Sequence, residues 1–166
     1  MPRACCYDRW SPPRFMTAIH IGPATESERE WCARLMASSQ PWTTLRRDLE
    51  GCRAVLHRPG GELFIARDEK GQAQGFILLA PYGFAGSPYI SAIAVVPEAQ
   101  GRRVGSQLMA FAEQRFADRG HLFLLVSSFN LRAQHFYRQC GYQFVGELTN
   151  YIVAGHSELI FHKPLP

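Results

Sequence analysis

The stretch AVVPEAQGRRVGSQL, residues 94–108, decides the fold of this chain. In it, an apolar strand ends at a proline, a turn of small and polar residues follows, and an amphipathic helix begins. Such a turn directs several free backbone N–H groups at one point, with the positive end of the helix dipole behind them. Gly101 and Gly105 let the backbone approach a phosphate closely, and Arg102 and Arg103 add positive charge. The stretch predicts an anion site; taken alone, an ordinary turn with solvated arginines is the alternative.

The segments on either side of this turn alternate between strand and helix patterns. Expected strands cover residues 17–22, 62–68, 75–82, 89–97, 121–129, 142–148 and 157–165. Expected helices begin at Thr25, where Thr25 and Glu28 form a capping box, at about Thr43, near Val104 and at Asn130. The order predicts a single α/β domain with a mixed sheet and helices on both faces. We expect residues 17–166 to form this domain and residues 1–16 to form an N-terminal extension.

The composition is typical of a globular protein. Hydrophobic residues make up 46% of the 166 residues, charged residues 19%, and the formal net charge is +4. A nucleic-acid module would show a denser basic stripe with interleaved aromatics, whereas a polyanionic small molecule needs only a few local cations. No stretch approaches the roughly 18 apolar residues of a membrane span, and the N-terminus lacks the apolar region of a secretory signal. Five cysteines without a CxxC pair indicate free thiols, so we expect a cytoplasmic protein with no metal.

A second segment, NLRAQHFYRQCGY at residues 130–142, makes the first one more specific. Together the two resemble the GNAT superfamily of acetyltransferases, whose motifs are V-x-P-x-x-[QR]-x-x-G-x-[GA] and N-x-x-A-x-x-[FL]-Y-x-x-x-G-[FY]. The second motif matches at every defined position. In the first, Arg103 stands where the family usually has glycine. A side chain fits there only with a negative φ or with a tolerated left-handed conformation, and its guanidinium suits phosphate oxygens.

The resemblance implies a mostly antiparallel mixed sheet with two splayed central strands, residues 89–96 and 121–129. It implies that acetyl-CoA is the co-substrate and that its pantetheine arm lies between these strands. The pyrophosphate is then expected on the backbone amides of Gln100, Gly101, Arg102, Arg103, Val104, Gly105 and Ser106. The Val95 N–H is expected to bind the acetyl oxygen as it gains negative charge, and the Tyr137 hydroxyl the departing sulfur. For Asn130, a helix cap explains the residue fully, and a cofactor contact is left open.

The residue that removes the proton from the acceptor amine is not identified by the sequence. Many members of the family carry a glutamate in the strand before the phosphate turn, where this chain offers only Ser91. Glu147, Tyr151 and His156 lie in or beside the connection expected to border the acceptor pocket, and Trp42 is a further candidate wall of that pocket. Without a strong base, an amine of low pKa is favoured, because more of it is neutral at pH 7.

We therefore expect an N-acetyltransferase that acts on a small-molecule amine or a peptide N-terminus by direct attack, without nucleic-acid or membrane partners. A non-catalytic acyl-CoA sensor and an enzyme with another acyl group or a hydroxyl acceptor are the alternatives, and a homodimer is left open. His156-Ser157-Glu158 supplies the H-x-E of a zinc deaminase, but the PCxxC partner motif is missing.

Overall fold

The computed structural model describes residues 18–166, so the expected extension, residues 1–16, lies outside the described residues. The strands are β1 (His20–Pro23), β2 (Glu62–Arg67), β3 (Ala73–Phe84), β4 (Ser87–Val95), β5 (His121–Ser127), β6 (Gln143–Thr149) and β7 (Ser157–Pro164). The α-helices are α1 (Glu26–Ala37), α2 (Leu49–Leu56), α3 (Val104–Arg115) and α4 (Leu131–Gln139). Within residues 18–166, no helix has the length and apolar character needed to cross a membrane.

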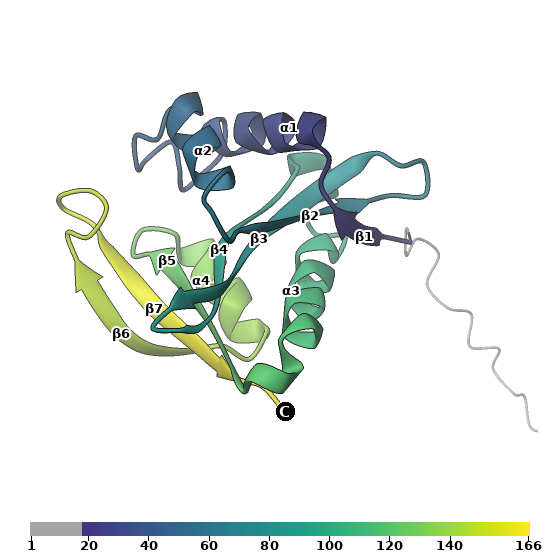
Figure 1. Cartoon of the computed structure of the whole chain (residues 1–166). Coiled ribbons are helices and arrows are strands. Elements are labelled where there is room, and N and C mark those ends of the chain that lie inside the picture. Colours follow the sequence, from purple (N-terminus) through teal and green to yellow (C-terminus); the bar gives the residue numbers. More distant parts are fainter. Residues whose placement is uncertain (1–17) are drawn as a thin grey trace, which may run out of the picture.

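The strands form one mixed sheet in the order β1-β2-β3-β4-β5-β7-β6. The pairing of β4 with β5 is parallel, and the other five pairings are antiparallel. Figure 1 shows α1 and α2 on one side of this sheet and α3 and α4 on the other. Each side has its own apolar cluster, one containing residues of α1 and α2 and the other residues of α3 and α4. The predicted mixed sheet with helices on both faces is confirmed.

Polar side chains fix where the first two helices begin. Thr25 caps α1: its side chain accepts from the Glu28 N–H, and Glu28 Oε2 accepts from the Thr25 N–H at 2.8 Å, which confirms the predicted capping box. The second helix begins at Leu49, because Asp48 accepts a 2.8 Å hydrogen bond from the Gly51 N–H. The predicted start near Thr43 is wrong; residues 40–46 form turns.

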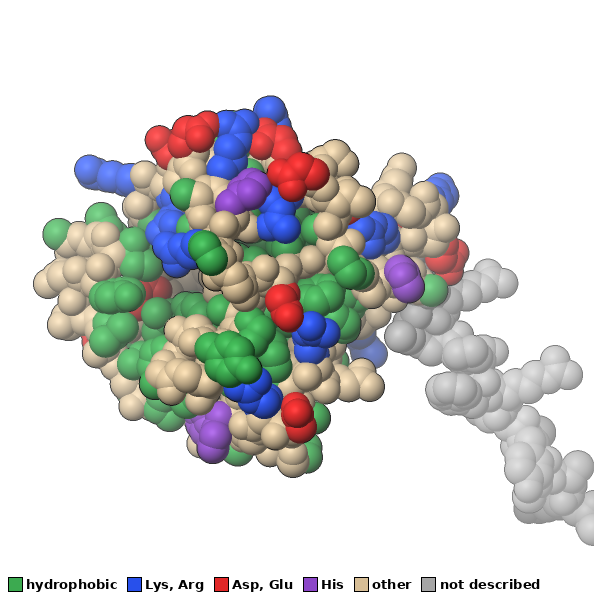
Figure 2. All heavy atoms as spheres, viewed as in Figure 1, with side chains coloured by type: hydrophobic (Ala, Val, Ile, Leu, Met, Phe, Trp, Pro, Cys, Tyr) green, Lys and Arg blue, Asp and Glu red, His purple; other side chains and the backbone are tan. Residues whose placement is uncertain are grey.

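Charged side chains gather over the outer face of α1 and α2, at the top of Figure 2. Arg53 of α2 contacts Glu30 of α1 at 2.7 Å and so ties the two helices together. Arg67 of β2 pairs with Glu28 of α1 at 2.7 Å and ties the helix to the sheet. These pairs leave the opposite, apolar face of each helix free to pack on the sheet.

The centre of the sheet is split. Strand β4 pairs with β5 only at Tyr89 with Phe123 and Ile90 with Leu124, as far as the described residues go. On its other side, β4 continues to pair with β3, but Leu79 lies opposite Ile90 and Leu78 opposite Ala92. Ser91 is therefore the extra residue of a β-bulge. Because a bulge bends its strand, β4 turns away from β5 at the point where their pairing ends.

Candidate active site

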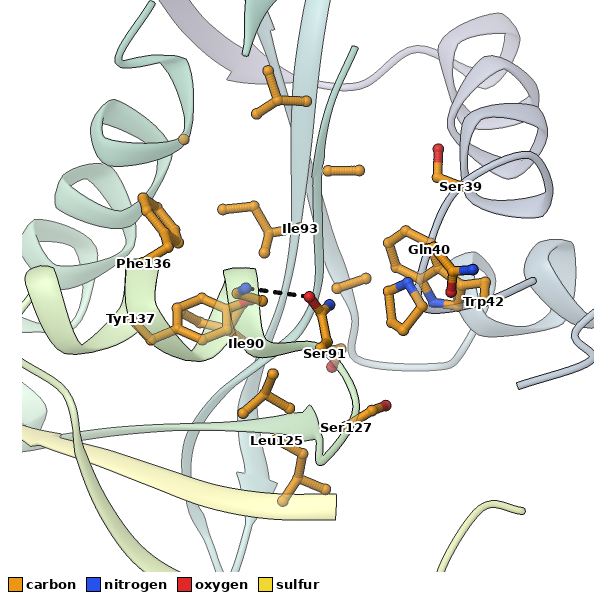
Figure 3. A pocket seen from close by; sticks show the side chains of 18 of the residues that line it. Ser39, Gln40, Trp42, Ile90, Ser91, Ile93, Leu125, Ser127, Phe136 and Tyr137 are labelled. Atoms are coloured by element: carbon orange, nitrogen blue, oxygen red, sulfur yellow. Dashed lines mark hydrogen bonds between the residues drawn. The ribbon is translucent and has the colours of Figure 1, made fainter. Parts of the chain in front are cut away.

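One cavity of about 1160 Å³ passes through the split between β4 and β5. On one face of the sheet its walls come from the start of α3 and from α4; on the other they come from the connection between α1 and α2. Figure 3 shows the two sides, with Phe136 and Tyr137 of α4 on one side of β4 and Ser39, Gln40 and Trp42 on the other. The volume exceeds the roughly 300–1,000 Å³ usual for a single small ligand, so the cavity has room for two reactants.

The turn before α3 forms the end of the cavity on the α3 and α4 side. Gly101 has φ +79° and Arg103, the residue before the helix, has φ +63°. Arg103 thus adopts the left-handed conformation that glycine takes more easily, and this chain tolerates it there. Within residues 18–166, the backbone N–H groups of Gly101 and of residues 103–106 have no hydrogen-bond partner. These five free donors lie at or just before the positive end of a helix, an arrangement suited to bind an anion.

Two of the backbone amides expected to bind phosphate, those of Gln100 and Arg102, already donate hydrogen bonds within the turn. The Gln100 N–H donates to the Pro97 carbonyl at 3.2 Å, and the Arg102 N–H donates to the Ala99 carbonyl at 3.2 Å. The Gln100 side chain has a structural role as well, since its Nε2 donates to the Val95 carbonyl at 3.2 Å. Gln100 therefore holds the end of β4 against the turn, while the free donors come from Gly101 and residues 103–106.

Basic side chains border the same end. Arg103 and Arg132 line the cavity, and Arg102 is exposed outside it. None of the three forms a salt bridge with a carboxylate of the described chain. Gly105 serves packing, because a Cβ there would lie 3.2 Å from Phe136 Cζ of α4. Its lack of a side chain lets α3 and α4 meet beside the free amides.

Two further backbone donors point into the split from β4. The Val96 N–H donates to Gln74 of β3 at 2.9 Å. Since successive N–H groups of an extended strand point to opposite sides, those of Val95 and Ile93 point away from β3 and toward the gap that β5 leaves. Both residues line the cavity. Val95 therefore directs its N–H away from β3 at the cavity wall, and Ile93 supplies a second such donor that the sequence analysis did not name.

Tyr137 lies on the inner face of α4, 7% exposed, and lines the cavity. Its ring packs against Phe136, Tyr142 and Phe161, with centroid separations of 5.4, 6.4 and 6.4 Å. The hydroxyl makes no hydrogen bond within residues 18–166 and is not fully enclosed, so it is open to the cavity. Burial raises the pKa of Tyr137, and the neighbouring Tyr89 raises it further, so the hydroxyl stays protonated and can donate. Asn130 caps α4 by accepting from the Ala133 N–H at 3.2 Å, and it also lines the cavity.

The residues expected at the acceptor side divide into two groups. Trp42, Ser91 and Tyr151 line the cavity. Glu147 is exposed on β6 outside it. His156 also lies outside the lining, with its ring edge-on to Phe129 at 4.8 Å. The structure thus brings three of the five residues to the cavity and leaves the other two beside it.

A carboxylate that the sequence analysis did not select lies inside this half of the cavity. Glu158 of β7 is 4% exposed, and its Oε1 accepts a 2.7 Å hydrogen bond from Ser127 Oγ at the end of β5. Burial raises the pKa of Glu158, and the Ser127 hydrogen bond and the charge of Arg47 oppose that rise. A carboxylate with a raised pKa in a cavity wall is a candidate for accepting a proton from a ligand. The sequence signal was an acidic residue directly before the apolar run at 159–161.

The family model for the acetyltransferase (GNAT) family matches residues 24–142, more than half of the chain. Among curated proteins no match is found. Nourseothricin acetyltransferase is 32% identical, with 65% of this chain and 67% of that chain covered and a TM-score of 0.58. An aminoglycoside 6'-N-acetyltransferase solved with coenzyme A is 16% identical, with 89% and 98% covered and a TM-score of 0.69.

A third solved structure, the ribosomal-protein-S18-alanine N-acetyltransferase of Escherichia coli, is 16% identical. It covers 89% of this chain and 94% of its own, with a TM-score of 0.68. The two structures at 16% identity share the fold with this chain over nearly its whole described length. The family match is consistent with the split sheet and with the free amides in the turn before α3. The chain belongs to the GNAT family of acetyltransferases.

Proposed function

We propose that this protein transfers an acetyl group from acetyl-CoA to the primary amine of a small molecule or a peptide N-terminus, by direct attack of the amine. The observation that carries the proposal is one continuous cavity through the split sheet, with free backbone amides at one end and a buried carboxylate at the other. A direct transfer needs both reactants in one space, because the amine must reach the thioester carbonyl without a covalent enzyme intermediate.

The anion end suits the pyrophosphate of coenzyme A. The N–H groups of Gly101 and residues 103–106 supply the donors, and Arg103 and Arg132 supply positive charge. The pantetheine arm would lie in the gap along β4, where a strand would otherwise pair. The aminoglycoside 6'-N-acetyltransferase that shares this fold was solved with coenzyme A, which supports the assignment.

The transfer itself would take place where β4 bends. The N–H groups of Val95 and Ile93 hold the pantetheine and the acetyl oxygen, and a fixed donor is most valuable as that oxygen becomes negative. The Tyr137 hydroxyl faces the same part of the cavity and donates to the departing sulfur. Its raised pKa means that it helps by donating a hydrogen bond and completes proton transfer only as the thiolate forms.

An amine-panel assay with acetyl-CoA tests the proposal, with free thiol followed over time. Turnover that depends on the added amine, with the N-acetyl product found by mass spectrometry, is the expected result. Binding of coenzyme A without turnover on any amine would favour the sensor alternative. Neither turnover nor a thermal shift at millimolar coenzyme A would refute the proposal, and acetyl-CoA hydrolysis without an amine is the blank.

A further inference from the structure

The acceptor half of the cavity carries side chains of both charges. Glu158 lines it, and so do Arg47, just before α2, and Arg58, just after α2. Figure 2 shows this side of the molecule on the left, where a hollow opens between the α2 region and the β6–β7 hairpin and basic side chains stand at its upper rim. A recognition site with both signs of charge fits a ligand that carries both signs.

The Glu158 carboxylate has one hydrogen-bond donor, and no cationic side chain forms a salt bridge with it among the described residues. Ser127 Oγ donates to Oε1, and Oε2 receives no hydrogen bond from residues 18–166. Glu158 also forms no salt bridge within that part of the chain. A buried carboxylate without a counter-charge is costly, so its position in a cavity wall points to a cation or a proton donor supplied by a ligand.

The two arginines are likewise without a carboxylate partner among the described residues. Arg47 is close enough to Glu158 to act on its charge, yet no salt bridge joins them. Arg58 acts in the same way on Tyr89, which also lines the cavity. Both arginines therefore share the lining of the cavity with the carboxylate without forming a salt bridge to it.

We propose that the acceptor is a zwitterion: an amine that binds Glu158 and Ser127, with an anionic group, carboxylate or phosphate, that binds Arg47 and Arg58. This inference rests on the proposed function, and it narrows the acceptor from any amine to those with an anion near the reacting nitrogen. Trp42 and Tyr151 line the same half and offer an apolar surface for the rest of the molecule.

In the proposed reaction, Glu158 accepts the first proton from the acceptor. An ammonium on the acceptor gives one proton to Oε2 and becomes nucleophilic. Its nitrogen then forms the C–N bond as the C–S bond breaks, the second proton leaves the nitrogen, and the sulfur ends as a thiol. The sum is ammonium plus thioester giving amide, thiol and one proton, which Glu158 passes to water. No oxidant, reductant or metal takes part.

The same charges weigh against a polycationic acceptor. Glu158 is the one carboxylate among the described residues that line this cavity, and two arginines share its acceptor half. A polyamine would place additional ammonium groups near these arginines, and like charges repel one another. The site therefore discriminates by repulsion as well as by attraction.

The test compares matched acceptors in the acetyl-transfer assay. Each α-amino acid is paired with its amide, each short aminoalkyl phosphate with its alcohol, and spermidine represents polycations. We expect the anionic member of the preferred pair to have a kcat/KM about 10- to 100-fold higher than its neutral partner. This factor corresponds to the free energy that a hydrogen bond to a charged group usually contributes. The intrinsic reactivity opposes this, because a neighbouring anion raises the pKa of the amine and lowers its neutral fraction. The two kinds of pair distinguish carboxylate from phosphate recognition.

Single substitutions test which residues cause the preference for an anionic acceptor. Arg47→Gln and Arg58→Gln should each lower kcat/KM for the anionic member and bring the ratio within a pair toward one. Glu158→Gln should lower kcat for both members by about 10²–10⁴. The matched controls are Arg46→Gln, an exposed arginine outside the cavity, and Glu147→Gln, an exposed glutamate outside it. Both controls should leave the rates and the ratio unchanged.

Coenzyme A affinity and melting temperature are measured for every variant. Unchanged values show that the fold and the proposed function are intact. Amine turnover with no anionic preference, or with a preference for spermidine, would overturn the zwitterion inference and leave the proposed function standing. Bound coenzyme A with no zwitterion acetylated would also overturn it. Failure to bind coenzyme A would instead remove the proposed function.

Discussion

Replacing Tyr137 by phenylalanine removes one oxygen and leaves the ring where it is. The ring keeps its contacts with Phe136, Tyr142 and Phe161, and the hydroxyl has no hydrogen-bond partner within residues 18–166 to lose. The melting temperature should therefore stay within about 2 °C, since removing a hydroxyl that has no hydrogen-bond partner, with the ring packing kept, costs little, about 0.5 kcal/mol or less. Coenzyme A affinity should also hold, because the anion site is built from other residues.

The rate of acetyl transfer should fall by about 10²–10⁴, the usual contribution of a positioned acid. That range corresponds to about 3–5 kcal/mol of lost transition-state stabilisation. The hydrogen bond from Tyr137 to the sulfur strengthens only as negative charge develops on the sulfur. Its removal should therefore lower kcat and leave the binding of acetyl-CoA unchanged. Because burial raises the Tyr137 pKa, deprotonation of this hydroxyl should not produce an alkaline decline in rate up to about pH 10.

The decisive measurement is a single turnover on the best acceptor, with enzyme in excess over acetyl-CoA. Steady-state rates alone would hide the effect if product release were limiting. A phenylalanine variant whose single-turnover rate stays within threefold of the natural chain would refute the reasoning. Tyr137 would then be a packing residue, and water or another group would protonate the sulfur.

Three further results are expected. Coenzyme A at about 100 times its dissociation constant should add roughly 2.7 kcal/mol of stability, which a thermal shift of about 5–10 °C would show; no shift would contradict the anion site. Arg103→Gly should relieve the left-handed strain and raise the free energy of unfolding by roughly 0.5 kcal/mol, yet weaken coenzyme A binding several-fold; Arg102→Gly, outside the cavity, should do neither. The hydrogen bond from Arg67 holds the pKa of Glu28 at about 2, below its usual 4.5, so this stabilisation is present above pH 4.5 and disappears as the pH falls toward 2. Glu28→Gln should cost about 1–3 kcal/mol at pH 7 and much less at pH 2, where about half of the Glu28 carboxyl groups are protonated, as measured by urea unfolding; an equal loss at both pH values would exclude the ion pair as the cause.

The parts of the site that are local in sequence could be predicted from it. Residues 94–108 and 130–142 each hold a turn, a cap and a helix start, and short-range geometry fixes where their groups point. The cap at Asn130 follows from the residue type at the start of the helix, whereas the position of Tyr137 at the cavity was implied by the resemblance to the family. For Arg103 the sequence left two conformations open, and the structure has the left-handed one.

The acceptor half could not be predicted, because distant elements build it. Glu158 meets Ser127 only through the register of β5 with β7, which pairs these two residues directly. Arg47 reaches the cavity because Asp48 delays the start of α2 and leaves the preceding residues in turns. Neither the register nor the path of a turn is readable from periodicity. A search by residue type near the expected pocket selected Glu147 and His156, which lie close in sequence but outside the cavity.

The bulge at Ser91 leaves the sheet as two halves, β1–β4 and β5–β7, joined by a ladder of two residue pairs and by the helices beneath. A reactant that lies in the gap and accepts from the Ile93 and Val95 amides stands in for the missing stretch of strand. With the reactant bound as proposed, the protein's own substrate would complete the interrupted sheet. Hydrogen exchange at these two amides would slow when the gap is filled and quicken when it empties. Release of the coenzyme would leave the Ile93 and Val95 amides without an acceptor again, so pairing across this part of the sheet would depend on the bound reactant.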